Sequence, residues 1–145
     1  MSAKEIKALE RRLYEEMNKG KAATMAAIDE LYATDHVVHG GHYVVSGDIK
    51  DFKKSISDIY SAFPDIHFTI DDMVVEGDKV AVRLTFSGTH KGEFMGIPPT
   101  NKKWTMWEII IDRIAGGKFV ESWVRYDTLG FMQQLGAVST PEKGR

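Results

Sequence analysis

Apolar residues recur at three- and four-residue steps through the first third of the chain, and this spacing predicts helices. The apolar face of the first helix consists of Ile6, Leu9, Leu13 and Met17. A second helix is expected over residues 21–33. A third is expected to begin at Asp48 or Asp51, either of which can cap it, and to end at Pro64. Residues 34–46, rich in His, Val and Gly, separate the second and third helices.

The pattern changes after Pro64 to an alternation of apolar and polar residues, which predicts β-strands. Strands are expected over residues 66–75, 80–87, 104–114 and 119–126. A last helix is expected from Thr128 to Gly136, and the polar residues that follow are expected to fray. Helices followed by an antiparallel meander predict an α+β fold in which the helices cover one face of the sheet. A sheet that curves around these helices would enclose a tapered cavity.

Length and composition indicate a single globular domain over residues 1–145, with 43% hydrophobic and 28% charged residues. The 19 basic and 21 acidic residues leave a net charge of −2, so no basic excess is available to neutralise phosphates. Nucleic acid is therefore not an expected partner. The absence of cysteine excludes disulfides and thiolate chemistry. No run approaches the ~18 apolar residues of a membrane span. We expect a soluble, cytoplasmic protein with no membrane partner.

Six short segments of the second half carry a specific resemblance. In order along the chain they read AFPD (62–65), VEGDKVAVR (75–83), GTHKGEF (88–94), GIPPT (96–100), GKFVESW (117–123) and DTLGFMQQLG (127–136). This succession resembles the SnoaL-like polyketide cyclase family, also described as ester cyclases, within the NTF2-like superfamily. The resemblance covers about residues 29–135 and departs from the family pattern at Asn101, where the Pro-Pro-Thr-Gly loop usually has glycine. Asn tolerates a positive φ, so the turn can survive.

The resemblance implies an NTF2-like cone, in which a curved antiparallel sheet wraps around helices and encloses a deep apolar pocket. It implies ring closure of a hydrophobic polyketide-like carbonyl compound by intramolecular aldol condensation, with no metal and no cofactor. Cones of this kind commonly pair through the outer face of the sheet, so a homodimer or higher homo-oligomer is expected. Apolar residues on both faces of residues 104–114 agree with that expectation.

Asp127 is the predicted general acid/base, because the family's Glu-x-Trp-x-x-x-Asp pattern maps onto Glu121, Trp123 and Asp127. A carboxyl buried among aromatic residues has a raised pKa, which suits proton transfer near neutral pH. Two observations oppose this role: Asp127 can simply cap the last helix, and a cation at Arg125 would lower its pKa. His90, in the family's Gly-Thr-His-x-Gly pattern, is the second predicted catalytic residue and would polarise the substrate oxygen.

Substrate contacts are predicted for several aromatic, sulfur-containing and basic residues. The predicted substrate-binding residues are His39, Phe94, Met95, Trp107, Arg113 and Trp123. The alternative is that the aromatic residues fill the core or an interface, and that Arg113 forms an ion pair with Glu108 or Glu121. The histidines at 36, 39 and 42 suggest a zinc site, but their spacing is not a common metal motif and no metal is expected.

Two other functions remain open from the sequence. The first is a non-catalytic protein that binds a small apolar molecule, which predicts that Asp127 is exposed or only a helix cap. The second is another enzyme on the same cone, such as a ketosteroid isomerase or an epoxide hydrolase. An epoxide hydrolase would need an Asp–Arg–Asp set, for which Arg83 or Arg125 with Asp112 and Asp127 are the candidates. The cyclase hypothesis predicts instead that Asp127 is buried and faces a cavity.

Overall fold

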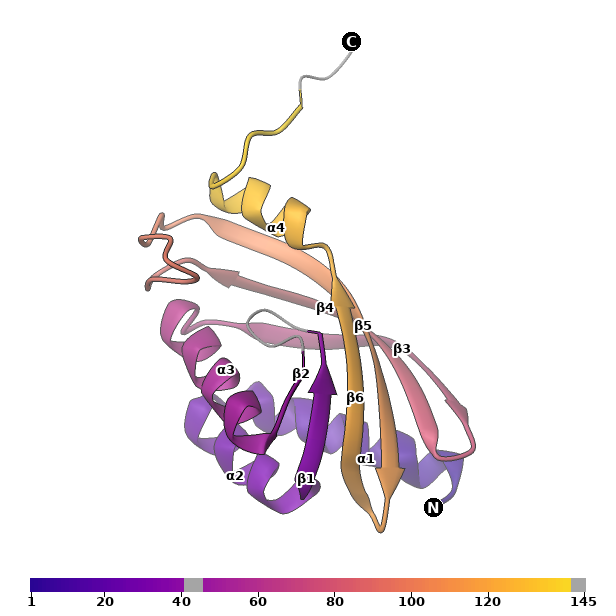
Figure 1. The fold of residues 1–145 in the computed structure, drawn as a ribbon. Helices are drawn as coiled ribbons and strands as arrows, with labels where there is room; N and C mark the ends of the chain where they lie inside the picture. The colour runs from indigo at the N-terminus through magenta and orange to yellow at the C-terminus, as the bar shows by residue number, and fades with distance from the viewer. Residues whose placement is uncertain (41–45, 142–145) are drawn as a thin grey trace.

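Helices and a single curved sheet form two layers in the computed structural model, which describes residues 1–40 and 46–141 (Figure 1). The sheet has the strand order β2-β1-β6-β5-β4-β3 and is open, with β3 at one edge. The elements in chain order are α1 (Ala3–Met17), α2 (Lys21–Leu31), β1 (Tyr32–His39), β2 (Ser46–Gly47), α3 (Ile49–Ala62), β3 (His67–Glu76), β4 (Lys79–Thr89), β5 (Lys103–Ala115), β6 (Lys118–Tyr126) and α4 (Thr128–Leu135). The expected α+β arrangement is confirmed.

Capping residues place the beginnings of the helices. Ser2 and Glu5 form a capping box at the start of α1, and Asp48 and Asp51 form another at the start of α3. Both acids that the sequence offered as caps for the third helix therefore contribute. The last helix is capped by Asp127, one residue before the predicted Thr128, and it ends at Gly136, whose φ of 81° is the left-handed C-cap conformation.

The strand β1 is the main difference from the sequence prediction. Residues 34–39 had no predicted element, and the second helix was expected to continue two residues beyond Leu31. β1 instead runs parallel to β6, with Val38 paired to Ser122, so the sheet is mixed rather than wholly antiparallel. Its register shifts between Tyr32 and Val37, and this irregularity hides the alternation that would have revealed a strand.

Hairpin turns join β3 to β4 and β5 to β6, between strands that the sequence predicted. The turn between β5 and β6 consists of Gly116 and Gly117, whose φ angles are 59° and 74°. A two-residue turn with both φ values positive matches the twist of antiparallel strands and favours glycine. Asn101, which replaces the family glycine, has a φ of 58°. The substitution thus preserves the left-handed backbone at that position.

The two faces of the sheet differ in what they pack against. Inner side chains of β4 and β5 alternate toward α1, α2 and α3 and are buried. The outer face of β5 remains apolar and exposed, with Trp107 at 56%, Ile109 at 42% and Ile111 at 38% of their full accessible surface. No helix among the described residues is long and apolar enough to cross a membrane.

Candidate active site

A cavity lies between the helices and the inner face of the sheet. Its volume is about 100 Å³, and aliphatic and aromatic side chains from α1, α2, α3, β4 and β5 supply most of its wall. Its lining includes Leu13, Met17, Ile28, Phe52, Ile56, Ile59, Ile66, Phe68, Phe86 and Ile110. An engineered cavity of about 150 Å³ is known to hold benzene. The present cavity is smaller than that and mainly apolar, so a molecule that fits it has to be compact and apolar.

Among the described residues that line this cavity, Glu108 on β5 is the one carboxylic acid. Burial, and then the nearby Asp112, raises the pKa of the Glu108 carboxyl from its usual 4.5 to about 8. A carboxyl with this pKa is present in both protonation states near neutral pH. It can accept a proton in one step and return it in the next.

Two tyrosines, Tyr14 of α1 and Tyr32 at the start of β1, line the same cavity. Burial and the neighbouring carboxyls raise the pKa of both phenols well above 10, so both hydroxyls keep their protons at neutral pH. Neither hydroxyl forms a hydrogen bond with another described residue. Each is therefore available to donate a hydrogen bond to an oxygen of a bound molecule.

A chain of buried polar groups connects β5, β6 and β1 next to this site. The Ser122 hydroxyl donates to Asp112, and the distance between His36 Nε2 and the Ser122 oxygen is 2.9 Å. The Ser122 hydroxyl donates its one proton to Asp112, so His36 Nε2 is the donor in its hydrogen bond with Ser122. His36 Nδ1 has no hydrogen-bond partner among the described residues. Burial lowers the pKa of His36 to about 4. The imidazole is therefore neutral.

Glu10 and Asp112 add two further buried carboxyls. Burial, and then the Asp112 carboxyl, raises the pKa of Glu10 well above 4.5, and burial raises that of Asp112. Both Glu10 oxygens and Asp112 Oδ2 lack a hydrogen-bond partner with acceptable geometry. No Lys or Arg side chain among the described residues is buried beside these groups. Burial thus raises the pKa values of the interior acids, and no buried cation lowers them again among the described residues.

Asp127, the predicted catalytic acid, lies outside the lining of this cavity. It is exposed at the N-terminus of α4, where its Oδ1 accepts a hydrogen bond of 2.9 Å from the backbone N–H of Gly130. The capping alternative that the sequence left open thus describes its position. A catalytic role for Asp127 stays a prediction.

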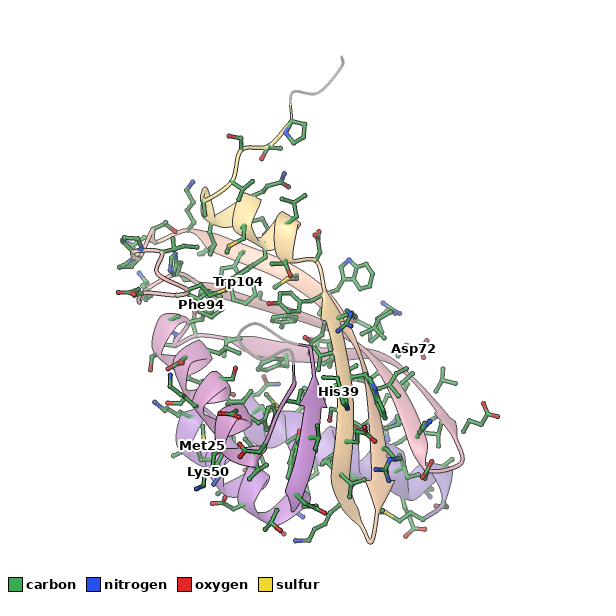
Figure 2. The ribbon with its side chains drawn as sticks, viewed as in Figure 1. Met25, His39, Lys50, Asp72, Phe94 and Trp104 are labelled. Atoms are coloured by element: carbon green, nitrogen blue, oxygen red, sulfur yellow. The ribbon has the colours of Figure 1, made fainter. Side chains whose placement is uncertain are left out.

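His90, the other predicted catalytic residue, belongs to a second aromatic cluster below α4. Thr100 donates its backbone N–H to His90 Nδ1 at 3.3 Å, which leaves the proton on Nε2. His90 lies 5.7 Å from Phe63 between ring centroids, and Phe63 contacts Phe94 and Trp104 at 4.9 and 4.8 Å. Figure 2 shows Phe94 and Trp104 together at the end of the sheet nearest α4. Neither His90 nor Phe94 lines the cavity.

The remaining predicted contacts lie on other surfaces. His39 Nε2 and Arg113 both bind the Glu121 carboxylate, at 2.8 and 3.1 Å, and the His39 ring stacks on Trp123. The hydrogen bond from His39 and then that from Arg113 lower the pKa of Glu121. Met95 is exposed in the loop after β4, and Trp107 is on the outer face of β5. None of these residues lines the cavity, so their predicted contacts with substrate stay predictions.

The histidines at 36 and 39 diverge. His36 points to Ser122 and His39 to Glu121, which are consecutive residues on opposite faces of β6. The third histidine of the spacing, His42, lies outside the described residues. Among the residues that are described, no three His, Cys, Asp or Glu side chains gather as metal ligands would.

Glu108 is the functional candidate that the sequence reasoning missed, having considered it only as an ion-pair partner. A usable signal was present. Glu108 shares its parity along β5 with Trp104, Met106 and Ile110, which form the buried face of that strand. Alternate residues of a strand point to the same face, so an acid that alternates in step with buried apolar residues is directed into the core.

The chain is similar to known proteins in sequence and in fold. The family model described as SnoaL-like polyketide cyclase matches residues 8–135. The chain belongs to the SnoaL-like polyketide cyclase family. Membership supports a cyclase-type function, and the cone fold is the one expected of NTF2-like proteins. Comparison with curated proteins gives no match.

Solved structures of similar proteins cover nearly the whole chain. AclR from Streptomyces galilaeus, a proposed hydroxylase, is 27% identical over 98% of this chain and 87% of its own, with a TM-score of 0.86. IdmH from Streptomyces antibioticus, a proposed polyketide cyclase, is 31% identical over 90% of this chain and 97% of its own, with a TM-score of 0.75. A SnoaL-like protein from Jannaschia shares the fold at 20% identity, covering 97% and 98% of the two chains, with a TM-score of 0.84.

Proposed function

We propose that this SnoaL-like protein is a cofactor-independent enzyme that closes a ring in a compact, apolar dicarbonyl compound by intramolecular aldol addition. Glu108 is the proposed acid/base. The observation that carries the proposal is a single carboxyl with a pKa of about 8 in the wall of an apolar cavity. Two protonated phenols line the same cavity and supply hydrogen-bond donors.

The proposed reaction needs only protein groups. The Glu108 carboxylate removes a proton from the carbon beside one carbonyl, and the electron pair of that C–H bond forms an enolate. Hydrogen bonds from Tyr14 or Tyr32 stabilise the enolate oxygen. The enolate carbon then attacks the second carbonyl of the same molecule, forming the new C–C bond and an alkoxide. Glu108, now a neutral acid, returns its proton to that alkoxide. No atom is gained or lost.

Hydrogen–deuterium exchange at a simple ketone tests the first step without knowledge of the natural substrate. Cyclopentanone would be incubated with the protein in D₂O, and the loss of its α-proton signal followed by NMR. Because a positioned general base contributes about 10² to 10⁴-fold, Glu108→Gln is expected to slow the exchange by about 100-fold or more. The wild-type rate is expected to rise with pH up to about 8 and then level off, because the carboxylate is the active form.

Asp127→Asn is the matched control, since it removes one carboxylate from the exposed cap of α4. We expect its exchange rate to stay within twofold of wild type. If Asp127→Asn abolishes exchange and Glu108→Gln does not, the acid predicted from the sequence is the catalytic one. Binding of the ketone without exchange in the wild-type protein would identify a non-catalytic binding protein. The cap position of Asp127 favours that second candidate function.

We also propose that the outer face of the sheet joins two copies of the chain. Trp107→Asp is expected to weaken self-association at least 30-fold, because a buried interface tryptophan typically contributes 2 kcal/mol or more. Light scattering over a dilution series would measure this. Leu129→Asp is the control, because Leu129 is 59% exposed but lies on α4. Equal masses for wild type and Trp107→Asp would contradict the proposed interface.

A further inference from the structure

A second space lies on the other side of one wall of the cavity. An open groove of about 600 Å³ lies between α1 and β3, the edge strand of the sheet. Polar and charged residues surround it, among them Lys7, Arg11, Glu15 and Asp72. Figure 2 places Asp72 on the β3 side of the molecule, far from Phe94 and Trp104. The groove is therefore a different space from the aromatic cluster below α4.

Two side chains separate the groove from the cavity. Tyr14 and Phe68 are the residues that line both spaces. Their ring centroids are 5.7 Å apart, so the rings are in contact and form one partition. One side of the partition faces the apolar cavity, and the other side faces the open groove with its polar and charged lining.

Packing and hydrogen bonds hold this partition in place. Asn18 clamps the backbone of Phe68 on the free edge of β3: it donates to the Phe68 carbonyl at 2.8 Å and accepts from the Phe68 N–H at 2.7 Å. The Phe68 ring stacks on Phe86 with a centroid distance of 5.6 Å and an interplanar angle of 19°. The wall is thus a fixed structure rather than a loosely packed side chain.

We infer that the Tyr14–Phe68 partition determines substrate specificity by limiting the length of the substrate to that of the cavity. We call this role a length stop. The inference rests on the proposed use of the cavity as the substrate site. The substrate class is accordingly a compact, uncharged carbonyl compound without a long or ionised tail. Removing the Phe68 ring would join the cavity to the groove and give a tail access to water. A carboxylate tail, excluded from a wall that contains Glu108, would then reach the open groove, whose lining holds Lys7 and Arg11 together with Glu15, Asp71 and Asp72.

Phe68→Ala and Phe86→Ala form a matched pair for the test. Both are phenylalanines that line the cavity and are buried, at 8% and 4% exposed, but only Phe68 also lines the groove. Affinities would be measured by calorimetry for 2-alkanones from butanone to 2-decanone and for 9-oxodecanoic acid. Phe68→Leu and Phe86→Leu replace the alanine variants if circular dichroism shows that either alanine variant is unfolded.

Wild-type affinity is expected to rise about fourfold per methylene and then stop rising once the chain reaches the partition. In Phe68→Ala the rise should continue to 2-decanone, and 9-oxodecanoic acid should bind at least 30-fold more tightly than to wild type. Phe86→Ala enlarges a closed space, so its affinity should rise for ketones a few methylenes longer than in wild type. It should still not bind 9-oxodecanoic acid. Equal binding of the acid by both variants, or tight binding by wild type, would overturn the inference.

Failure of the length stop is separable from failure of the proposed function. If butanone binds and Glu108→Gln abolishes ketone exchange, but the length limit does not change in Phe68→Ala, only the inference about the partition is wrong. If the wild-type protein binds no alkanone and exchanges no ketone, the cavity is not the substrate site and both proposals fall.

Discussion

The protein is expected to lose up to about 4 kcal/mol of stability between pH 5 and pH 9 through Glu108 alone. The folded-state pKa of about 8 lies above the usual 4.5, so the folded chain holds this proton more tightly than the unfolded chain does. Stability is therefore full below pH 4.5 and is lost as the pH rises through 8. Each unit of pKa corresponds to about 1.4 kcal/mol, and solvent screening of the partly exposed Glu108 side chain reduces the full amount.

Urea unfolding at pH 5, 6, 7, 8 and 9 measures this dependence. Glu108→Gln keeps the shape of the side chain and has no proton to lose, so its stability curve should be flatter and should exceed that of wild type at pH 9. A residual slope from Glu10 and Asp112 is expected, because burial raises their pKa values too. Glu76→Gln is the control, since Glu76 is exposed at the end of β3. A Glu108→Gln slope as steep as that of Glu76→Gln would show that Glu108 is not buried as an acid.

Phe94→Ala is expected to cost about 3 to 5 kcal/mol of stability, the usual range for removing a buried aromatic ring. Phe94 is 0% exposed and contacts Phe63 and Phe131 at ring distances of 4.9 and 5.7 Å. Ketone exchange per folded molecule should be unchanged, because Phe94 does not line the cavity. Thermal unfolding and the cyclopentanone assay together provide both readouts.

Met95→Ala is the control for this effect, because Met95 is the next residue and is 40% exposed. Its stability should stay within about 0.5 kcal/mol of wild type. The sequence prediction assigned both residues to the substrate pocket. That prediction would be supported if Phe94→Ala kept its stability and lost affinity for ketones.

The sequence predicted the parts of the fold that local chemistry determines. Asp48 and Asp51 stand at the start of α3, and Gly116 and Gly117 form the turn between β5 and β6, because caps and turns depend on a few neighbouring residues. The sequence showed apolar residues on both faces of β5, and only the structure separates the buried face from the exposed one. The strand β1 was missed because its partner β6 is remote and its register is irregular.

The site was harder to predict because its groups come from distant parts of the chain. Tyr14, Tyr32 and Glu108 belong to a helix and two strands, and no local pattern brings them together. A family motif predicted Asp127 as the catalytic acid instead. The side-chain oxygen of Asp127 and the residues that follow it fit a helix cap equally well. Convergence on a cavity is a property of the tertiary structure, and the sequence showed only that β5 carried an acid on its apolar parity.

The parallel pairing of β1 with β6 delays completion of the sheet during synthesis. His36 and Ser122, which meet across these strands, are 86 residues apart. At about 5 to 20 residues per second, β1 waits roughly 4 to 17 s before its partner has been synthesised. Throughout that interval the edge of β1 that pairs with β6 stays uncovered. Nascent chains that stall before β6 are therefore the species most prone to aggregate and most dependent on chaperones.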